Sequence, residues 1–477
     1  MNNIEFLKKN EIEKIHSLAL KNLWEFGFWV NETKILKFLA EKGCSVNLNE
    51  KIVKFPTEFV EECLNTAPRS FKMGARERSN IVTIGKDKIH TRPMSGCHQI
   101  LDLNSGVCRL GLASDVINCT LLVNNLENYS YMGAIIYPSE EAPILRDVHV
   151  AKLMLENSLK HVRFQPFEAK NLKYVIEFCK TLIKNEEESI NEPLISIVSA
   201  PSSPLKYSKN EIEIFELASK NKIPVEIGST PISGATGPVT LAGQLALIHT
   251  ETLAGLTILQ AINPGTPVIY SPRPNTMDMR TGSALWGAIE FGITSAACVQ
   301  LAHYINVPTD IMGAGTDSKT LDEQTGMEKA MNLSLAALSG SDIVSGLGFI
   351  ETINTASYEQ LLMDNELAGM MFRVLKGIDI NDEKLAIDVI REIGFHGNFL
   401  SHEHTREYFR EEHYITNIFD RKSRDAWNSA GSKELAEVGN DKVREVLKNA
   451  EAPHLEDDVK KELNSIYKAA KNDILSK

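Results

Sequence analysis

The chain has 477 residues, of which 43% are hydrophobic and 24% are charged, a balance that is typical of globular proteins. Its net charge of −12 argues against nucleic acid or an anionic membrane surface as a partner. The seven cysteines include no Cys-x-x-Cys pair, the N-terminus lacks the apolar core of a signal peptide, and no window approaches a membrane span, so we expect a cytoplasmic protein with reduced thiols and no metal site.

Residues 1–112 are expected to form an N-terminal segment of helices followed by a small β patch. Charged and apolar residues interleave at helical spacing up to about residue 75. The stretches NIVTIGKDKIHTR (80–92) and HQILDLNSGVCRLG (98–111) each predict a strand, a turn and a second strand. The second of these turns is expected at residues 104–106.

Residues 113–377 alternate short apolar segments with helical stretches. Seven strands are predicted, at 131–136, 161–166, 194–200, 225–229, 268–272, 310–315 and 342–348. This alternation predicts an α/β fold, and seven or eight units over roughly 250 residues favour a (β/α)8 barrel of the TIM type over a doubly wound sheet. The eighth strand is not evident in the sequence. The charged helical stretch 378–477 is expected to form a C-terminal cap.

In such a barrel the active site lies in the loops that follow the strands. We expect these loops to bring together aromatic, polar and small residues around a substrate. The candidates are Tyr137, Phe164, Gln165, Gly234, Tyr270, Thr316, Ser345, Phe349 and Glu351.

The loop SPRPNTMDMRTG (271–282) places a carboxylate and a guanidinium close together after the fifth predicted strand. Asp278 and Arg280 could form an ion pair on the surface. Alternatively, Arg280 could bind a substrate carboxylate, with Asp278 orienting it or facing a cation. The sequence leaves both interpretations open.

The stretch STPISGATGPVTLAG (229–243) is rich in glycine and precedes a helical pattern. It lacks the lysine and the spacing of a phosphate-binding loop. Ser233 or Thr236 could cap the helix, with Pro238 in its first turn. The small residues could also let a ligand approach the backbone N–H groups near Gly234–Gly237.

Three histidines elsewhere in the chain invite a comparison with metal sites. His149 lies in DVHVAK, which resembles the Asp-x-His-x-x-Gly pattern of cobalamin ligation, but Lys152 replaces the glycine. His402 and His404 have no cluster of cysteines or carboxylates at ligand spacing. We expect no metal ligand among them.

Long stretches of the chain are similar to the trimethylamine methyltransferase family, and most of all to its branch without pyrrolysine, which includes glycine betaine methyltransferases. The resemblance rests on four segments in the same order, over roughly residues 10–415. They are DLNSGVCRLGLASDVIN (102–118), ISGATGPVTLAGQLALIHTETLAGLTILQAINPGTPVIYSP (232–272) followed by MDMRTG (277–282), GAGTDSKTLDEQTGMEKAMNLSLAALSGSDIVSGLGFIE (313–351) and TASYEQLLMDNELAGMMFRVLKGI (355–378).

The resemblance implies a (β/α)8 barrel that moves a methyl group from an amine to the Co(I) form of a separate corrinoid protein. This chain would then bind no cofactor and supply no nucleophile of its own. Pyrrolysine, which the archaeal trimethylamine enzymes carry, would fall near Ser345–Glu351, and its absence makes trimethylamine a poor candidate substrate. A quaternary amine needs no such residue, because it leaves as a neutral tertiary amine.

A quaternary ammonium group is held best by aromatic faces. The candidate cage residues are Tyr137, Phe164, Tyr270 and Phe349. A betaine also needs its carboxylate bound, for which Arg280, His98 or the amides near Gly234 are candidates.

Glycine betaine is the first expected substrate, and proline betaine, carnitine or γ-butyrobetaine would use the same chemistry. A zinc-dependent thiol or methanol methyltransferase is disfavoured, because no cysteine falls at the end of a predicted barrel strand. A non-catalytic betaine-binding barrel is a further alternative. Barrels of this size often associate, so we also expect a homo-oligomer.

Overall fold

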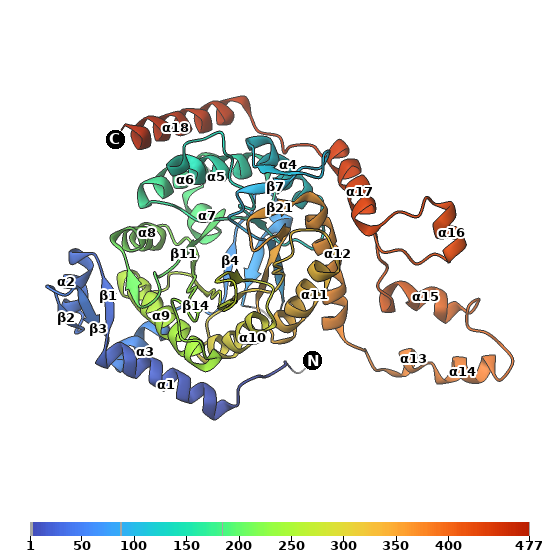
Figure 1. Cartoon of the computed structure of the whole chain (residues 1–477), viewed down its shortest axis with the longest axis horizontal. Helices are drawn as coiled ribbons and strands as arrows, with labels where there is room; N and C mark the ends of the chain where they lie inside the picture. The colour runs from blue at the N-terminus through green and yellow to red at the C-terminus, as the bar shows by residue number, and fades with distance from the viewer. Residues whose placement is uncertain (1–2, 86–87, 184, 477) are drawn as a thin grey trace.

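The computed structural model describes residues 3–85, 88–183 and 185–476, and its centre is a barrel of parallel strands surrounded by helices (Figure 1). Around the barrel the strands follow one another in chain order. They are β6 (His90–Pro93), β9 (Met132–Gly133), β10 (Val162–Phe164), β11 (Ile195–Ser199), β13 (Val225–Ile227), β15 (Val268–Tyr270), β18 (Asp310–Met312) and β19 (Ile343–Leu347).

Two junctions close the barrel. A parallel bridge between Tyr270 and Thr309 joins β15 to β18. On the other side, the backbone N–H of Ser130 donates to Thr91 O at 2.9 Å, beside the start of β9. Glycine is required here, because a Cβ on Gly133 would lie 2.7 Å from Pro93 O. The fold is therefore a closed (β/α)8 barrel, as predicted.

All seven predicted strands are present, and the strand that the sequence left unassigned is β6. The segment 80–92 does contain two strands, but they do not pair with each other. β5 (Val82–Ile84) pairs with β4 (Phe71–Met73), whereas β6 pairs with β19. The barrel sheet therefore begins at His90, inside the segment 1–112. The hairpin of β7 (Gln99–Leu101) and β8 (Cys108–Leu110) is confirmed.

Helices cover the outside of the barrel, one principal helix after each strand. They are α4 (Ala113–Asn124), α5 (Arg146–Asn157), α6 (Ala169–Leu182), α8 (Lys209–Lys220), α9 (Leu241–Ile262), α10 (Ile289–Tyr304), α11 (Glu323–Leu338) and α12 (Tyr358–Lys376); η2 (Pro143–Leu145) and α7 (Glu186–Asn191) are short additions. Within the described residues, α9 is the one helix long and apolar enough to span a membrane, but 83% of its apolar window is buried inside the fold. It packs against its neighbours as a core helix.

The N-terminal segment packs against one side and one end of the barrel. Helices α1 (Lys9–Glu25) and α3 (Thr57–Thr66) lie against α9. A small sheet beside α2 (Thr33–Glu41) combines β1 (Phe28–Val30), β2 (Ser45–Asn47), β3 (Ile52–Lys54) and β12 (Lys206–Tyr207). The hairpin β4–β5, with η1 (Arg78–Asn80) in its connection, packs on Tyr131, Ile269 and Ile343. It closes the N-terminal end of the barrel.

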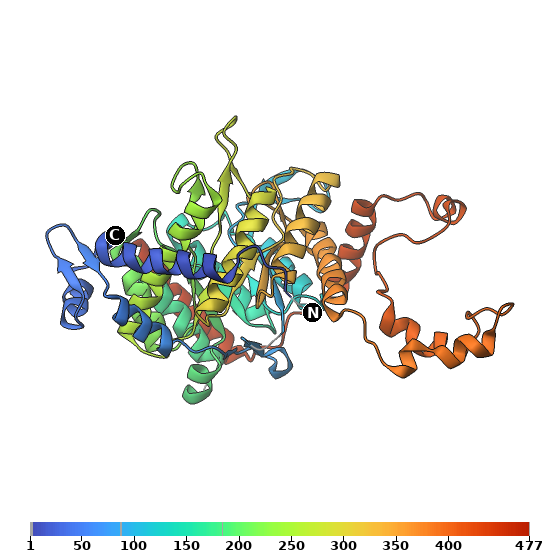
Figure 2. The same cartoon turned by 90° about the horizontal axis from the view of Figure 1, so that it is seen from below.

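Only part of the stretch 378–477 caps the barrel. Helix α17 (Leu435–Asn449) packs on α4 and α12, and α18 (Asp457–Leu475) packs on α5 and α6. The intervening chain projects away from the barrel (Figures 1 and 2) and contains α13 (Asp382–Leu385), α14 (Ile387–Ile393), α15 (Glu403–Glu412) and α16 (Arg424–Ser429).

Two buried histidines in the barrel wall make stability depend on pH. Burial lowers the pKa of His90 and of His161 to about 4. Because an imidazole in the unfolded chain has a pKa near 6.5, the unfolded state binds more protons between pH 6.5 and pH 4. The stability that these neutral side chains contribute is complete above pH 6.5 and is lost as the pH falls through this window.

We expect each of these histidines to lower the free energy of unfolding by about 2 kcal/mol when the pH falls from 7 to 5. Denaturant unfolding at both pH values measures this loss. Asp147, whose pKa burial raises to about 6, acts in the opposite direction. The double variant H90N/H161Q should therefore lose clearly less free energy of unfolding than the wild type between pH 7 and pH 5. An equal loss would show that these histidines do not cause the pH dependence.

Candidate active site

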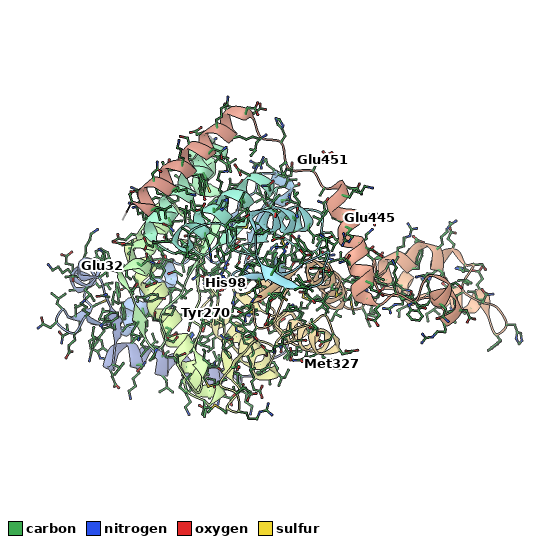
Figure 3. All side chains as sticks on the ribbon, turned by 45° about the horizontal axis from the view of Figure 1, so that its top comes forward. Glu32, His98, Tyr270, Met327, Glu445 and Glu451 are labelled. Carbon is green, nitrogen blue, oxygen red and sulfur yellow. The ribbon has the colours of Figure 1, made fainter. Side chains whose placement is uncertain are left out.

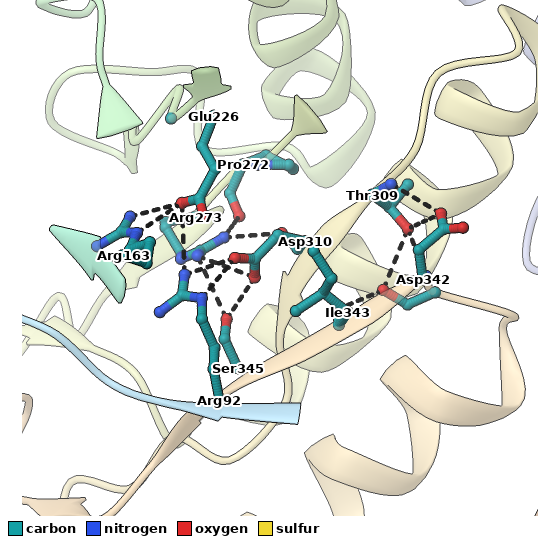
Figure 4. A network of polar contacts seen from close by, with 12 residues as sticks. Arg92, Arg163, Glu226, Pro272, Arg273, Thr309, Asp310, Asp342, Ile343 and Ser345 are labelled. Carbon is teal, nitrogen blue, oxygen red and sulfur yellow. Dashed lines mark hydrogen bonds and ion pairs between the residues drawn. The ribbon is translucent and has the colours of Figure 1, made fainter. Parts of the chain in front are cut away.

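An ionic network fills the interior of the barrel (Figure 4). Its members come from strands spread around the barrel, and all are buried. Arg92 lies on β6, Arg163 on β10, Glu226 on β13 and Asp310 on β18, and Arg273 follows β15. The network therefore joins strands that are far apart in the sequence.

Asp310 lies at the centre of this network. Its Oδ2 accepts hydrogen bonds from Arg92 Nε at 2.8 Å and from Arg92 Nη2 at 2.5 Å. Its Oδ1 accepts from Ser345 Oγ at 2.5 Å, and Arg273 Nη2 lies 3.2 Å away. Burial alone would raise the pKa of this carboxyl, but Arg92 and Arg273 outweigh it and lower the pKa. Asp310 is therefore ionised.

Glu226 is bonded through one oxygen only. Its Oε2 accepts from Arg163 Nε at 2.9 Å, from Arg163 Nη2 at 2.6 Å and from Arg92 Nη2 at 3.4 Å. Its Oε1 is buried and has no hydrogen-bond partner among the described residues. Three hydroxyls are likewise buried without a hydrogen-bond partner among the described residues, those of Tyr131, Ser199 and Ser271. Because buried polar groups are costly without a partner, these atoms point to bound water or a polar ligand.

Charge counting adds a second sign of a ligand. The network contains three guanidinium groups and two carboxylates, which leaves one positive charge in excess inside the protein. An unbalanced buried charge is unfavourable, and a bound anionic group would neutralise it. The interior of the barrel is therefore suited to a bound anion.

Three aromatic rings gather at the carboxyl ends of β6, β9 and β10. The Tyr137 ring centroid lies 6.4 Å from that of His98 and 5.3 Å from that of Phe167. His98 immediately precedes β7 and is exposed; Figure 3 labels it near the middle of the barrel. Trp286, in the loop after β15, is a fourth aromatic side chain at this end of the barrel, and its backbone N–H donates to Asp317. Such faces can hold a cation.

The loop after β19 contains an unusual backbone turn. Glu351, Thr352 and Ile353 have φ angles of 56°, 53° and 65°, so three consecutive residues other than glycine adopt the left-handed conformation. The neighbouring loop holds the turn, since Glu351 N donates to Ser318 O at 2.6 Å and Thr352 N donates to Thr316 O at 3.1 Å. Each such residue costs about 1–2 kcal/mol. Strain of this kind concentrates at functional sites.

Several predicted residues lie at this end of the barrel. Glu351 accepts a hydrogen bond from Thr355 Oγ1 at 2.6 Å, and Thr316 Oγ1 donates to Glu328 at 2.7 Å. Gln165 is exposed after β10, and Ser345 belongs to the network around Asp310. Phe349 is buried in β20 (Phe349–Ile350), which pairs with β21 (Thr355–Ser357), and its ring centroid lies 4.7 Å from Lys329 Nζ. The structure therefore places Phe349 in the supporting core.

Phe164 and Tyr270 do not face the interior of the barrel, contrary to the prediction. Side chains alternate along a strand, and Arg163 points inward, so Phe164 points toward the surrounding helices. Likewise Ile269 packs inside the barrel, and the hydroxyl of Tyr270 is hydrogen-bonded to His249 on α9 at 3.2 Å. Phe167, three residues after Phe164, is the aromatic side chain that reaches the mouth.

The amides near Gly234 are not available to a substrate carboxylate, which corrects a second expectation. The N–H of Gly234 donates to Gly237 O, and the N–H of Gly237 donates to Ile232 O in the strand β14 (Ile232–Ser233). Helix α9 begins four residues after Gly237, and Thr240 caps it. Gly234 itself adopts a φ of +88° beside Met279.

Arg280 lies in the projecting hairpin of β16 (Asn275–Met277) and β17 (Ala284–Leu285), visible in Figure 2. Its side chain is 89% exposed, and its Nη2 lies 3.0 Å from Asp278 Oδ2. The structure therefore shows the surface ion pair and does not bring Arg280 to the substrate. Within this loop, Arg273 is the arginine that points into the barrel.

We expect Arg280→Ala to leave both the fold and the KM for a carboxylated amine unchanged, because an exposed local ion pair contributes little. Steady-state kinetics of the variant check this. An increase in KM of tenfold or more would show that the hairpin folds over the bound substrate.

The remaining histidines have structural surroundings. The His149 ring stacks on Tyr467 of α18, and the His402 side chain accepts a hydrogen bond from His404 N at the start of α15. Among the described residues, no group of three or more histidine, cysteine or carboxylate side chains is arranged to hold a metal ion.

Sequence reasoning missed Arg92, Arg163, Glu226, Arg273, Asp310, Phe167 and Trp286. A signal for three of these was present, since Arg163, Glu226 and Asp310 are charged residues inside or at the edge of short apolar strands. A charge in a strand that is covered by helices on one side must face the other side, which is the barrel interior.

Comparison with known proteins assigns the family. A model of the family "Trimethylamine methyltransferase (MTTB)" matches residues 1–474. The trimethylamine methyltransferase MttB of Methanosarcina barkeri is 31% identical over 468 residues, which cover 97% of this chain and 94% of the relative. The glycine betaine methyltransferase of Desulfitobacterium hafniense is 31% identical over 461 residues, covering 96% and 95%.

Among solved structures, the monomethylamine methyltransferase MtmB of Methanosarcina barkeri aligns with 98% of this chain and 87% of its own, at a TM-score of 0.48 and 13% identity. The family match over nearly the whole chain, together with the closed barrel, settles the assignment. The chain is a methyltransferase that belongs to the trimethylamine methyltransferase family.

Proposed function

We propose that this chain transfers a methyl group from a quaternary amine that carries a carboxylate, with glycine betaine the first candidate, to the corrinoid of a separate protein. The observations that carry the substrate class are the buried network in the barrel interior, which has one positive charge in excess, and the aromatic cluster at the carboxyl ends of β6, β9 and β10. A betaine has a carboxylate for the network and a quaternary ammonium group for the aromatic cluster. The similarity to a glycine betaine methyltransferase supports the same choice.

The aromatic cluster would hold the cationic end of the substrate. Tyr137 is 5% exposed, and the rings of Phe167 and His98 flank it. An aromatic face attracts a quaternary ammonium without forming a hydrogen bond, which suits a group that has no N–H to donate. The cluster therefore orients the methyl groups and excludes water from them.

Arg273 would bind the carboxylate end. Its Nη1 is occupied by the carbonyls of Pro272 and Asp310, at 2.8 and 2.9 Å, and these bonds fix the plane of the guanidinium. A fixed planar cation recognises a carboxylate better than a flexible one does. The unpartnered hydroxyl of Ser271, the residue before Pro272, would donate to the same anion.

The chemistry requires little from the protein beyond this positioning. A corrinoid in its Co(I) form would supply the nucleophile, and we place it on the partner protein, with no cofactor bound by this chain. Because the leaving group is a neutral tertiary amine, no side chain has to donate a proton. We also propose that the enzyme works in the cytoplasm, where Co(I) can be kept reduced.

Proline betaine, carnitine and γ-butyrobetaine would use the same two subsites. A catalytically silent betaine-binding barrel is the alternative of a different class. It would bind the same ligands and transfer nothing.

The test combines the protein with a reduced corrinoid protein and a panel of quaternary amines. Absorbance follows methylation of the corrinoid, and calorimetry measures binding of each amine separately. Transfer from at least one carboxylated quaternary amine, and none from trimethylamine, is the expected result. Binding without transfer would favour the silent barrel, and neither binding nor transfer would overturn the proposal.

A further inference from the structure

The projecting part of the C-terminal region lacks a hydrophobic core. Residues 378–417, which we call the arm, include no buried side chain. Many of its apolar side chains are exposed, among them Ile378 at 81%, Phe395 at 102% and Leu400 at 86%. A segment with no fully buried side chain offsets little of the conformational entropy lost on folding. Its helices therefore need a surface to cover them.

The barrel carries an apolar groove of a matching kind. The groove lies between α11 and α12 and has a volume of about 140 Å³, with walls that include Leu333, Leu338, Leu367, Met370 and Val374. Met331 on α11 and Val374 on α12 are 55% and 53% exposed. Figure 3 shows Met327, also on α11, at the outer surface of the molecule.

The groove continues into a larger hollow with a positive lining. This hollow has a volume of about 880 Å³ and shares Ala337 and Leu375 with the groove. Its charged lining comprises Arg69, Lys88 and Lys376 against one carboxylate, Asp342, apart from His303. Lys376 also pairs with Glu411 of the same chain, at 3.3 Å. Asp342 already accepts from the backbone N–H of Thr309 at 2.8 Å. The groove thus ends in a basic region.

The first half of the arm has the complementary charge. Residues 378–400 contain five carboxylates and two basic side chains, an excess of three negative charges. Helix α14 presents Ile387 and Ile390, which are 48% and 51% exposed, at a spacing that puts both on one face. An acidic helix with an apolar face is suited to an apolar groove with a basic end.

We propose that the arm of one copy of this chain binds the α11–α12 groove of a second copy, and that the exchange is reciprocal. The arm begins just after Lys376, which ends α12 and lines the hollow. It then leads away from its own groove (Figures 1 and 2). A two-fold axis near this point lays each arm across the partner's groove and covers both apolar surfaces in one closed dimer.

A cross-linking experiment tests the exchange directly on the full-length chain. In a C108S background, which removes the exposed cysteine and leaves the six buried ones, one variant carries F399C in the arm and another carries V374C in the groove. Mixing the two under mild oxidation should give a covalent dimer that neither variant gives alone. Native mass spectrometry of the wild type should show even-numbered oligomers at micromolar concentration.

Charged substitutions in the arm provide the second measurement. The variant I387D/I390D should weaken the dimer about 100-fold, because two buried isoleucines are lost from the contact. The matched control is V107D, which places the same charge on a 63% exposed valine of the β7–β8 hairpin and should leave the dimer intact. A monomeric wild type, or a mixture without the cross-linked dimer, would overturn the proposal. An arm that instead bound the corrinoid protein would leave the chain monomeric and would overturn it too.

Discussion

Replacing Asp310 by alanine is expected to lower the free energy of unfolding by about 4 kcal/mol. The substitution leaves Arg92 and Arg273 buried with no carboxylate between them, and it removes the acceptor of the Ser345 hydroxyl. An uncompensated charge inside a protein costs far more than the lost hydrogen bonds alone. Denaturant unfolding followed by circular dichroism measures the difference.

The matched control is Asp278→Ala, which removes the carboxylate of another aspartate–arginine pair. That pair lies at the surface, where Arg280 is 89% exposed and water solvates the remaining charge. We expect no measurable change in the midpoint of unfolding. A midpoint for Asp310→Ala equal to that of the wild type would show that water enters the barrel and solvates the arginines.

Replacing Arg273 by lysine is expected to lower kcat/KM for glycine betaine about 100-fold, which corresponds to about 3 kcal/mol. Lysine keeps the charge but loses the planar guanidinium that the carbonyls of Pro272 and Asp310 hold in a fixed orientation. Tetramethylammonium has the same cationic end and no carboxylate. Its transfer rate should therefore change less than threefold.

The comparison of two substrates separates binding from folding. A general loss of structure would slow transfer from both amines, whereas a lost carboxylate contact affects glycine betaine alone. Arg280→Lys, the same change in the exposed hairpin, is the control and should leave both rates unaltered. Equal losses with both substrates would show that Arg273 does not bind the substrate carboxylate.

The barrel could be predicted because most of its strands are apolar and its helices have a clear period. β6 was not predicted as a barrel strand, because the sequence His-Thr-Arg-Pro carries no apolar pattern. In addition, β5 lies a few residues earlier and suggested that the two strands pair as a hairpin. Its partner in the fold is β19, some 250 residues later. A pairing over that distance leaves no local signal.

The candidate site was predicted in part. The loops after the strands were located correctly, and Tyr137 and His98 do come together. The side of the strand on which a residue lies was the main source of error, because a shift of one position turns Phe164 away from the interior. The arginines and carboxylates of the network are paired across the barrel, so only the closed sheet shows that they belong together.

The distance between β6 and β19 also sets the order in which the protein can fold during synthesis. β6 leaves the ribosome early, but it can pair with β19 only after β19 has emerged. Arg92 likewise meets its carboxylate partners only after Glu226 and Asp310 have emerged. Until then a positive charge that is destined for the interior remains in water, where it keeps the nascent strand soluble. A topology with such distant contacts folds slowly, and the last barrel strand to emerge completes the closure.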